Sequence, residues 1–170
     1  RTVIGLGGLL TGAGGTIVGD VVIDGGLFSP GASPGVMTIV GDLDLAAGEL
    51  LFEFSPFGRD LVEVTGDVTA SGPFSLRLAF LGGFLPGDDD VLDLFDVGGV
   101  FNVDLALATL LVTGLPAGFD FTPELTDGGF GLRIDAGGVA PVPLPPAAAL
   151  LGVGLAALTL LRRRRGSHAA

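Results

Sequence analysis

The sequence predicts an all-β body with the stacked strands of a parallel β-helix, or solenoid, followed by one C-terminal transmembrane helix. Three observations lead to this prediction. Short apolar strands alternate with turns of Gly, Asp and Pro, a Gly-Asp pair recurs along the chain, and an uncharged apolar segment precedes four consecutive arginines. A β-sandwich is the alternative fold for the body, because it also joins many short strands by tight turns.

Composition divides the chain into four segments. We expect a Gly-rich body over residues 1–136, a Gly/Pro linker over 137–146, a transmembrane helix over 147–161 and a basic cytoplasmic tail over 162–170. The sequence begins at Arg1 and shows no charged-then-apolar leader, so we expect a truncated N-terminus and conclude nothing from the missing signal peptide.

Glycine content and strand periodicity favour β structure in the body. The chain contains 31 Gly, and each Gly in a helix interior costs about 1 kcal/mol relative to Ala. Apolar and polar residues alternate with period two in several short runs, including Thr38–Val40, Leu50–Phe54 and Ser75–Phe80. In the last run, Leu76, Leu78 and Phe80 are expected to share one face.

A Gly-Asp pair recurs with spacings of 22 and 25 residues, at Gly19-Asp20, Gly41-Asp42 and Gly66-Asp67. A period of roughly 20–29 residues with strands and glycine turns is typical of solenoid coils, which bury an inner face only by stacking on one another. Chance is the alternative explanation, because any all-β fold places glycine in its turns.

The pattern becomes looser beyond Gly99. Residues 101–113 predict one long strand with alternating apolar residues, and residues 119–121 and 132–134 predict two final strands. Since a β-helix needs a covered end, we expect this irregular part to cap the stack.

The apolar segment from Ala147 to Leu161 has fifteen residues without charge. A helix of that length spans about 23 Å, short of the ~30 Å hydrocarbon core, and snorkelling arginine side chains recover part of the difference. The segment is apolar on every face, unlike most core helices. It ends at a cytoplasmic stop signal of four consecutive arginines, Arg162, Arg163, Arg164 and Arg165.

Charge and residue types exclude several function classes. Residues 1–161 carry a net charge of −15, which repels the phosphates of nucleic acid. The chain has no Cys or Lys, and its single histidine is His168, so the body lacks the residues of Cys-His, Ser-His-Asp and Ser-Lys catalysis and of a zinc site. We therefore expect no cofactor.

Carboxylates are the remaining chemical groups. An acidic cluster after Pro86-Gly87 offers oxygen ligands for Ca²⁺, chiefly Asp88, Asp89, Asp90 and Asp93. The EF-hand and RTX patterns are not met, and we expect a solvated turn in preference to a metal site. For an enzyme, Asp42 and Asp67 are the candidate general acid and base, one coil apart. That alternative rests on fold analogy.

The C-terminus resembles a PEP-CTERM-type sorting signal in its VPLPA variant. The resemblance lies in the order of a Pro-rich motif, an apolar helix and an arginine cluster, the motif being Val142, Pro143, Leu144, Pro145 and Pro146. The variant has Ala where Pro146 stands. This resemblance implies a Gram-negative bacterium, export, a temporary hold in the inner membrane with the body in the periplasm, and processing by an exosortase-type transpeptidase.

The body resembles the passenger domains of autotransporters. The resemblance covers the run Gly26 to Leu43, which contains Pro30-Gly31-Ala32-Ser33-Pro34-Gly35, and the run Arg59 to Val68. Those passengers are right-handed parallel β-helices, so the resemblance implies that fold over roughly residues 15 to 135.

These patterns lead to an expected function without catalysis. We expect an exported surface or extracellular-matrix protein with a structural or adhesive role, whose partners are the inner membrane, an exosortase-type transpeptidase and extracellular polysaccharide. A carbohydrate-binding module and a polysaccharide-active β-helix enzyme are the alternatives.

Overall fold

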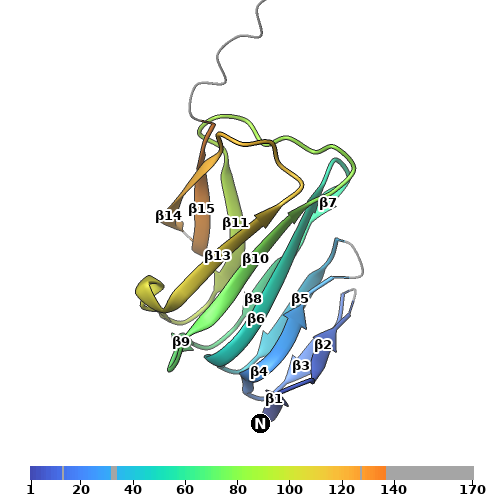
Figure 1. Ribbon diagram of the computed structural model, residues 1–170. Coiled ribbons are helices and arrows are strands. Elements are labelled where there is room, and N and C mark those ends of the chain that lie inside the picture. The colour runs from blue at the N-terminus through green and yellow to red at the C-terminus, as the bar shows by residue number, and fades with distance from the viewer. Residues whose placement is uncertain (13, 32–33, 127, 137–170) are drawn as a thin grey trace, which may run out of the picture. The chain divides into compact units, whose positions relative to one another are not determined.

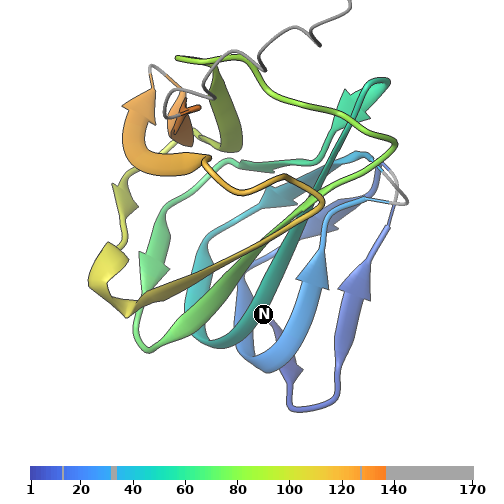
Figure 2. The same cartoon turned by 45° about the horizontal axis from the view of Figure 1, so that its top comes forward.

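The computed structural model describes residues 1–12, 14–31, 34–126 and 128–136, which belong to one compact unit, Arg1–Gly137. This unit is built from two β-sheets (Figures 1 and 2), so the all-β prediction for the body is confirmed at this level. The predicted linker, transmembrane helix, sorting motif and arginine cluster lie outside the described residues.

The first sheet, sheet A, has nine strands and is mostly parallel. Its main path is β1-β4-β6-β10-β13, and four short strands pair beside it. The bounds are β1 Thr2–Gly5, β2 Leu9–Thr11, β4 Val21–Ser29, β6 Leu43–Ser55, β7 Gly58–Arg59, β9 Val68–Ala70, β10 Phe74–Phe80, β12 Phe101–Asn102 and β13 Ala108–Thr113. In this sheet, the antiparallel pair is β6 with β7.

The second sheet, sheet B, has six strands in the order β3-β5-β8-β11-β15-β14. The bounds are β3 Thr16–Val18, β5 Val36–Val40, β8 Leu61–Val64, β11 Val91–Val97, β14 Asp120–Thr126 and β15 Gly129–Asp135. Pairing is parallel from β3 to β11 and antiparallel between β11, β15 and β14.

From β3 to β6 the chain alternates between the sheets, and β4, β5 and β6 each pair in parallel with the previous strand of their own sheet. After the short antiparallel strand β7, β8 again pairs in parallel with β5. The strands therefore stack in chain order, from blue at the N-terminal end to green further on (Figure 1). A β-sandwich of antiparallel hairpins, the alternative prediction, requires the opposite pairing, because consecutive strands of a hairpin are antiparallel neighbours. Among the described residues up to 113, the short pair of β6 with β7 is the one antiparallel hairpin, and the other strand pairs are parallel.

The parallel register places apolar side chains of neighbouring strands next to one another in the core. Val21 pairs with Leu43, and Leu43 pairs with Val68; all three side chains are fully buried. Phe28 and Leu50 form a second such pair in the same sheet. Strand β10 alternates buried and half-buried residues along its whole length, as the sequence predicted for this run. Side chains from both sheets fill one common core.

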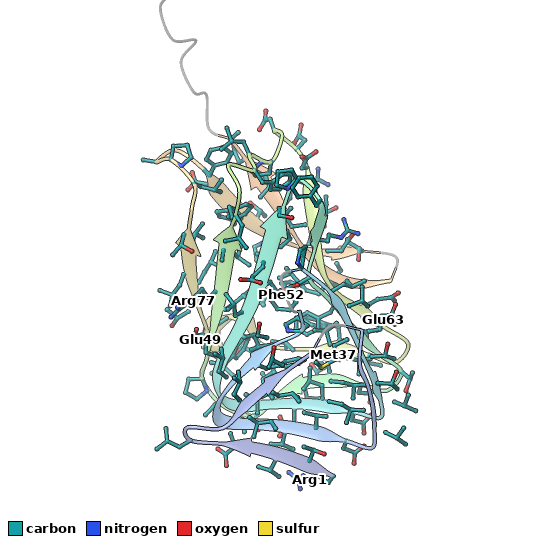
Figure 3. The ribbon with its side chains drawn as sticks, turned by 90° about the vertical axis from the view of Figure 1, so that its right-hand side faces the viewer. Arg1, Met37, Glu49, Phe52, Glu63 and Arg77 are labelled. Atoms are coloured by element: carbon teal, nitrogen blue, oxygen red, sulfur yellow. The ribbon has the colours of Figure 1, made fainter. Side chains whose placement is uncertain are left out.

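The outer faces of the sheets carry polar and charged side chains (Figure 3). Glu49 and Arg77 lie side by side on one outer face and form an ion pair of 3.0 Å. Phe52 and Met37 lie between the sheets, and Glu63 lies on the opposite outer face. The Glu63 carboxylate accepts a 2.8 Å hydrogen bond from the Thr38 hydroxyl on the neighbouring strand.

The prediction of one strand over residues 101–113 is wrong. The run contains strand β12, a 3-10 turn at Leu105–Leu107, and strand β13. The Asp104 carboxylate accepts a 3.0 Å hydrogen bond from the Ala106 amide and so caps the turn. Asp side chains often compete in this way with strand pairing, and periodicity alone does not reveal the competition.

The two predicted final strands are confirmed within β14 and β15, which form an antiparallel hairpin after the parallel strands. The outermost strand of sheet B in this region is β14, and that of sheet A is β13. In the part of the chain that the structure describes, no helix is long and apolar enough to cross a membrane.

Candidate functional site

The recurring Gly-Asp pairs lie next to one another in space and are joined by a chain of hydrogen bonds. Oδ1 of Asp20 accepts from the Asp42 amide at 3.2 Å, and Oδ1 of Asp42 accepts from the Asp67 amide at 2.9 Å. Oδ1 of Asp67 accepts from the Val100 amide at 2.8 Å. We call these four residues the Gly-Asp ladder. The spacing seen in the sequence therefore reflects real stacking of the turns.

Close approach of the stacked backbones requires glycine before Asp42, before Asp67 and before Val100. A Cβ atom on Gly66 would collide with the Asp42 carboxylate and the Gly41 carbonyl oxygen. A Cβ atom on Gly99 would collide in the same way with Asp67 and with the Gly66 carbonyl oxygen. Gly99 thus occupies the fourth turn, which sequence reasoning missed because Val100 stands where the other turns have aspartate.

The ladder also accounts for the two carboxylates considered as a general acid and base. Asp42 and Asp67 lie in adjacent stacked turns, and each uses one oxygen to accept a backbone hydrogen bond. Their geometry is that of turn-stabilising side chains. A general acid or base instead needs an oxygen directed at a substrate proton.

A buried carboxylate joins three segments of the chain that are separated in the sequence. Asp60 is fully buried; its Oδ1 accepts from the Gly35 amide at 2.7 Å and its Oδ2 from the Glu53 amide at 2.9 Å. The Asp60 amide in turn donates to the Glu53 carbonyl oxygen at 2.9 Å. Burial raises the pKa of Asp60 above its ordinary value, and the two amide hydrogen bonds oppose that rise.

Gly31 lies against the same carboxylate, and a Cβ atom there would collide with Oδ1 of Asp60. Gly31 thus leaves room for the carboxylate that accepts a hydrogen bond from the Gly35 amide. Sequence reasoning assigned no role to Asp60, because its partner amides lie 25 and 7 residues away and no local pattern connects them.

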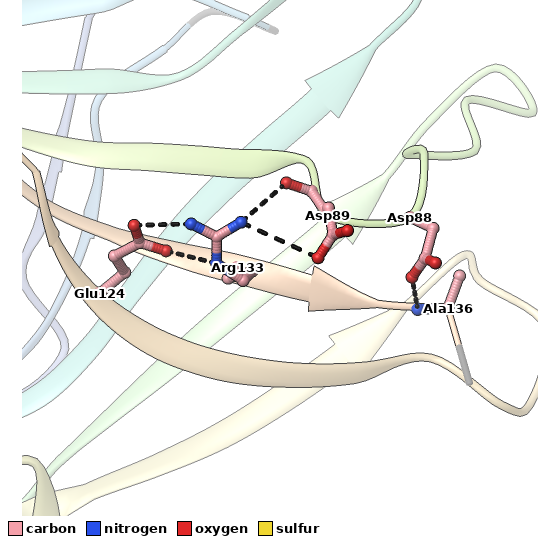
Figure 4. Close-up of polar contacts among 5 residues, drawn as sticks. All are labelled: Asp88, Asp89, Glu124, Arg133 and Ala136. Atoms are coloured by element: carbon pink, nitrogen blue, oxygen red, sulfur yellow. Dashed lines mark hydrogen bonds and ion pairs between the residues drawn. The ribbon is translucent and has the colours of Figure 1, made fainter.

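The acidic cluster proposed for Ca²⁺ is distributed over separate protein partners. The Glu124 carboxylate accepts a 2.7 Å hydrogen bond from Nη2 of Arg133, and its other oxygen lies 2.7 Å from Nε of Arg133 (Figure 4). Oδ1 of Asp89 lies 3.9 Å from Nη1 of Arg133. The pKa of Arg133 is raised chiefly by its hydrogen bond to Glu124. The Asp88 carboxylate accepts from the Ala136 amide at 3.1 Å.

The other two members of the cluster have their own partners. Asp90 accepts from the Gly87 amide at 2.6 Å, and Asp93 forms an ion pair of 3.0 Å with Arg59. Within the described ranges, no group of three or more His, Cys, Asp or Glu side chains is arranged to hold a metal ion. Backbone bonds also fix the loop against β15, because the Asp89 amide donates to the Ile134 carbonyl oxygen at 3.0 Å.

Millimolar CaCl₂ is therefore expected to leave the melting temperature unchanged, since binding would require these carboxylates to give up their present partners. A thermal melt followed by circular dichroism, with MgCl₂ as the ionic-strength control, measures the effect. A calcium-specific rise that is absent in Asp88→Asn and Asp90→Asn variants would contradict this expectation.

Glycines also form the floor of an open groove of about 510 Å³ on the side of sheet A that carries Glu49 and Ser75. The contributing glycines come from three successive parts of the chain: Gly7, Gly8, Gly25, Gly26 and Gly48. A Cβ atom on Gly48 would collide with the Gly26 carbonyl oxygen, so close backbone contact requires glycine here. Besides the glycine backbone, the groove is lined by the side chains of Leu9, Leu27, Glu49 and Ser75.

No family model matches this chain, and neither a curated protein nor a solved structure matches it.

Proposed function

We propose that this protein is an exported bacterial surface or extracellular-matrix component, whose body is a short parallel β-helix with a structural or adhesive role. The observation that supports this best is the stack of parallel strands tied by the Gly-Asp ladder. Stacked units of this kind produce long regular surfaces that need no catalytic centre. The polar residues of that surface point outward, as the Glu49–Arg77 pair illustrates.

The proposal for the C-terminal part rests on its sequence. Residues 142–146 would form the recognition motif, residues 147–161 the membrane helix, and Arg162–Arg165 the cytoplasmic stop signal. In PEP-CTERM-type proteins, whose tails this C-terminus resembles, an exosortase-type transpeptidase processes the tail. The body would then lie in the periplasm at first and at the cell surface or in the matrix afterwards.

Extracellular polysaccharide is the partner that we propose for the body. The glycine-floored groove favours it, because Leu9 and Leu27 can pack against the apolar face of a sugar ring, and the Glu49 carboxylate and the Ser75 hydroxyl can hydrogen-bond to its hydroxyls. The acid-base pair required by the enzyme alternative has less support, since the carboxylates of Asp42 and Asp67 bond to backbone amides.

Topology tests the export proposal. The full chain, fused behind an export leader in a Gram-negative host, is expected in the membrane fraction, with its body accessible to protease from the periplasm. Replacing Arg162–Arg165 by Glu is expected to release or misorient the protein, whereas replacing them by Lys preserves the arrangement, because the stop signal depends on positive charge. A body that remains in the cytoplasm would refute the proposal.

Processing is tested separately from topology. With an exosortase co-expressed, the chain is expected to shorten and leave the membrane, and Pro143→Ala with Pro145→Ala should abolish this while membrane integration persists. Leu151→Ala, inside the apolar run, is the matched control that should be processed normally. Processing that is unaffected by both proline substitutions would remove the proposed recognition motif.

A further inference from the structure

Strand β13 leaves an apolar sheet edge at the outer limit of sheet A. It pairs along its whole length with β10, and it pairs with no second strand among the described residues (Figure 1). Leu110 and Val112 are 39% and 36% exposed, although their register partners Leu76 and Leu78 in β10 are 5% and 0% exposed. Core-facing side chains are therefore covered on β10 and uncovered on β13.

This edge lacks the features that normally prevent strand addition. Edge strands are usually protected by charge, proline or a bulge. The edge of sheet B has such protection, since β14 contains Pro123 and Glu124. Strand β13 reads Ala-Thr-Leu-Leu-Val-Thr, and its register with β10 is continuous. Residues 105–119 contain no charged side chain, in a chain whose residues 1–161 carry −15.

We propose that β13 pairs antiparallel with β13 of a second copy, forming a two-fold dimer that joins the two copies of sheet A. A register centred on Leu111 places Leu111 opposite itself, Leu110 opposite Val112 and Thr109 opposite Thr113. Side chains that face the core stay on the core side, because opposite residues in a sheet point to the same face. Apolar residues meet apolar residues, and threonine meets threonine.

The uncharged stretch at this edge lets a second copy approach. Two bodies of the same strong negative charge repel each other over most of their surface, and the uncharged stretch 105–119 is where they approach with least repulsion. A two-fold contact uses the same patch on both copies, so a self-complementary strand suffices. The edge is only six residues long, so the dimer belongs to the weak, concentration-dependent class.

Cysteine cross-linking of the full-length protein in mild detergent tests the register, because the chain contains no cysteine of its own. Leu111→Cys is expected to form a disulfide-linked dimer under mild oxidation. Thr109→Cys alone should not, whereas a mixture of Thr109→Cys and Thr113→Cys protein should. Leu125→Cys is the matched control, since Leu125 is 72% exposed on the other edge strand and should stay unlinked.

Charge substitution provides a second measurement that does not depend on disulfide geometry. Leu111→Lys and Leu111→Glu are each expected to weaken the dimer about tenfold, as measured by sedimentation over roughly 1 µM to 1 mM protein, and mixing the two variants should restore it. Leu111 is 40% exposed and points outward, so both variants should fold.

Two results would overturn the dimer. One is equal cross-linking of the Leu111→Cys and Leu125→Cys proteins, which would indicate random collision or association through the C-terminal segment. The other is a monomer at all concentrations with no cross-link at Leu111→Cys. If the protein gave either result but was still exported, the dimer proposal would fail and the proposed function would stand.

Discussion

Gly48→Ala is expected to lower the free energy of unfolding by about 3 kcal/mol. Gly48 has a φ of +105°, which L side chains rarely adopt, and a Cβ atom would meet the Gly26 carbonyl oxygen and, at 3.1 Å, Cγ2 of Ile23. Backbone strain and steric overlap therefore add together at one position.

Two other glycines separate these effects. Gly7 has a φ of +76°, and a Cβ atom there would have no other atom within 4 Å, so Gly7→Ala should lose only about 1 kcal/mol from strain. Gly15 has neither constraint, and Gly15→Ala should be neutral or slightly stabilising. If Gly48→Ala and Gly7→Ala lost equal free energy of unfolding, steric overlap between the stacked strands would not contribute to the loss at Gly48.

Thermal and urea unfolding followed by far-ultraviolet circular dichroism measures these differences. Fluorescence is unsuitable, because the chain contains no Trp or Tyr. The dichroism of the strands reports on the body directly, and the full-length protein in one detergent keeps all variants comparable.

Asp60→Ala is expected to lose about 2–4 kcal/mol, because the amides of Gly35 and Glu53 would both lose their acceptor in a partly buried site. Asp60→Asn keeps one acceptor oxygen and should lose less, about 1–2 kcal/mol. Asp20→Asn at the exposed end of the ladder is the matched control and should change stability little, since Asn retains the oxygen that accepts from Asp42.

The pH dependence of stability gives an independent measurement of the buried charge. Because the pKa of Asp60 is raised in the folded protein, the folded state holds its proton more tightly than the unfolded state. Its contribution to stability is fully present below the ordinary pKa of 3.8 and is lost as pH rises through the folded pKa. As pH rises from 3.8 through the folded pKa, the free energy of unfolding of the wild type should therefore fall relative to that of Asp60→Asn. A difference that does not change with pH would contradict the raised pKa.

The sequence predicted those features of the fold that leave a regular repeat along the chain. The Gly-Asp spacing was visible because a stacked turn such as Gly66-Asp67 combines a residue without a Cβ atom with an acceptor side chain that follows it. The alternation in β10 was visible because burial on one face imposes period two.

Features that depend on distant partners were not visible. Asp60 appears in the sequence as an ordinary turn acid, and only the folded chain places it against amides from two other segments. The 3-10 turn at Leu105–Leu107 was hidden because one side-chain hydrogen bond from Asp104 competes with an otherwise strand-like pattern. The sheet edge at β13 could not be recognised before the pairing order was known.

The Gly-Asp ladder also bears on how such a chain can change in length over evolution. Its successive hydrogen bonds join residues 22, 25 and 33 positions apart, yet the turns remain directly stacked. Differences in length are thus absorbed in the segments between ladder positions, such as the connection from β10 to β11. Insertions in those connections would leave the turns aligned, so the protein can acquire new loops without altering the frame that carries them.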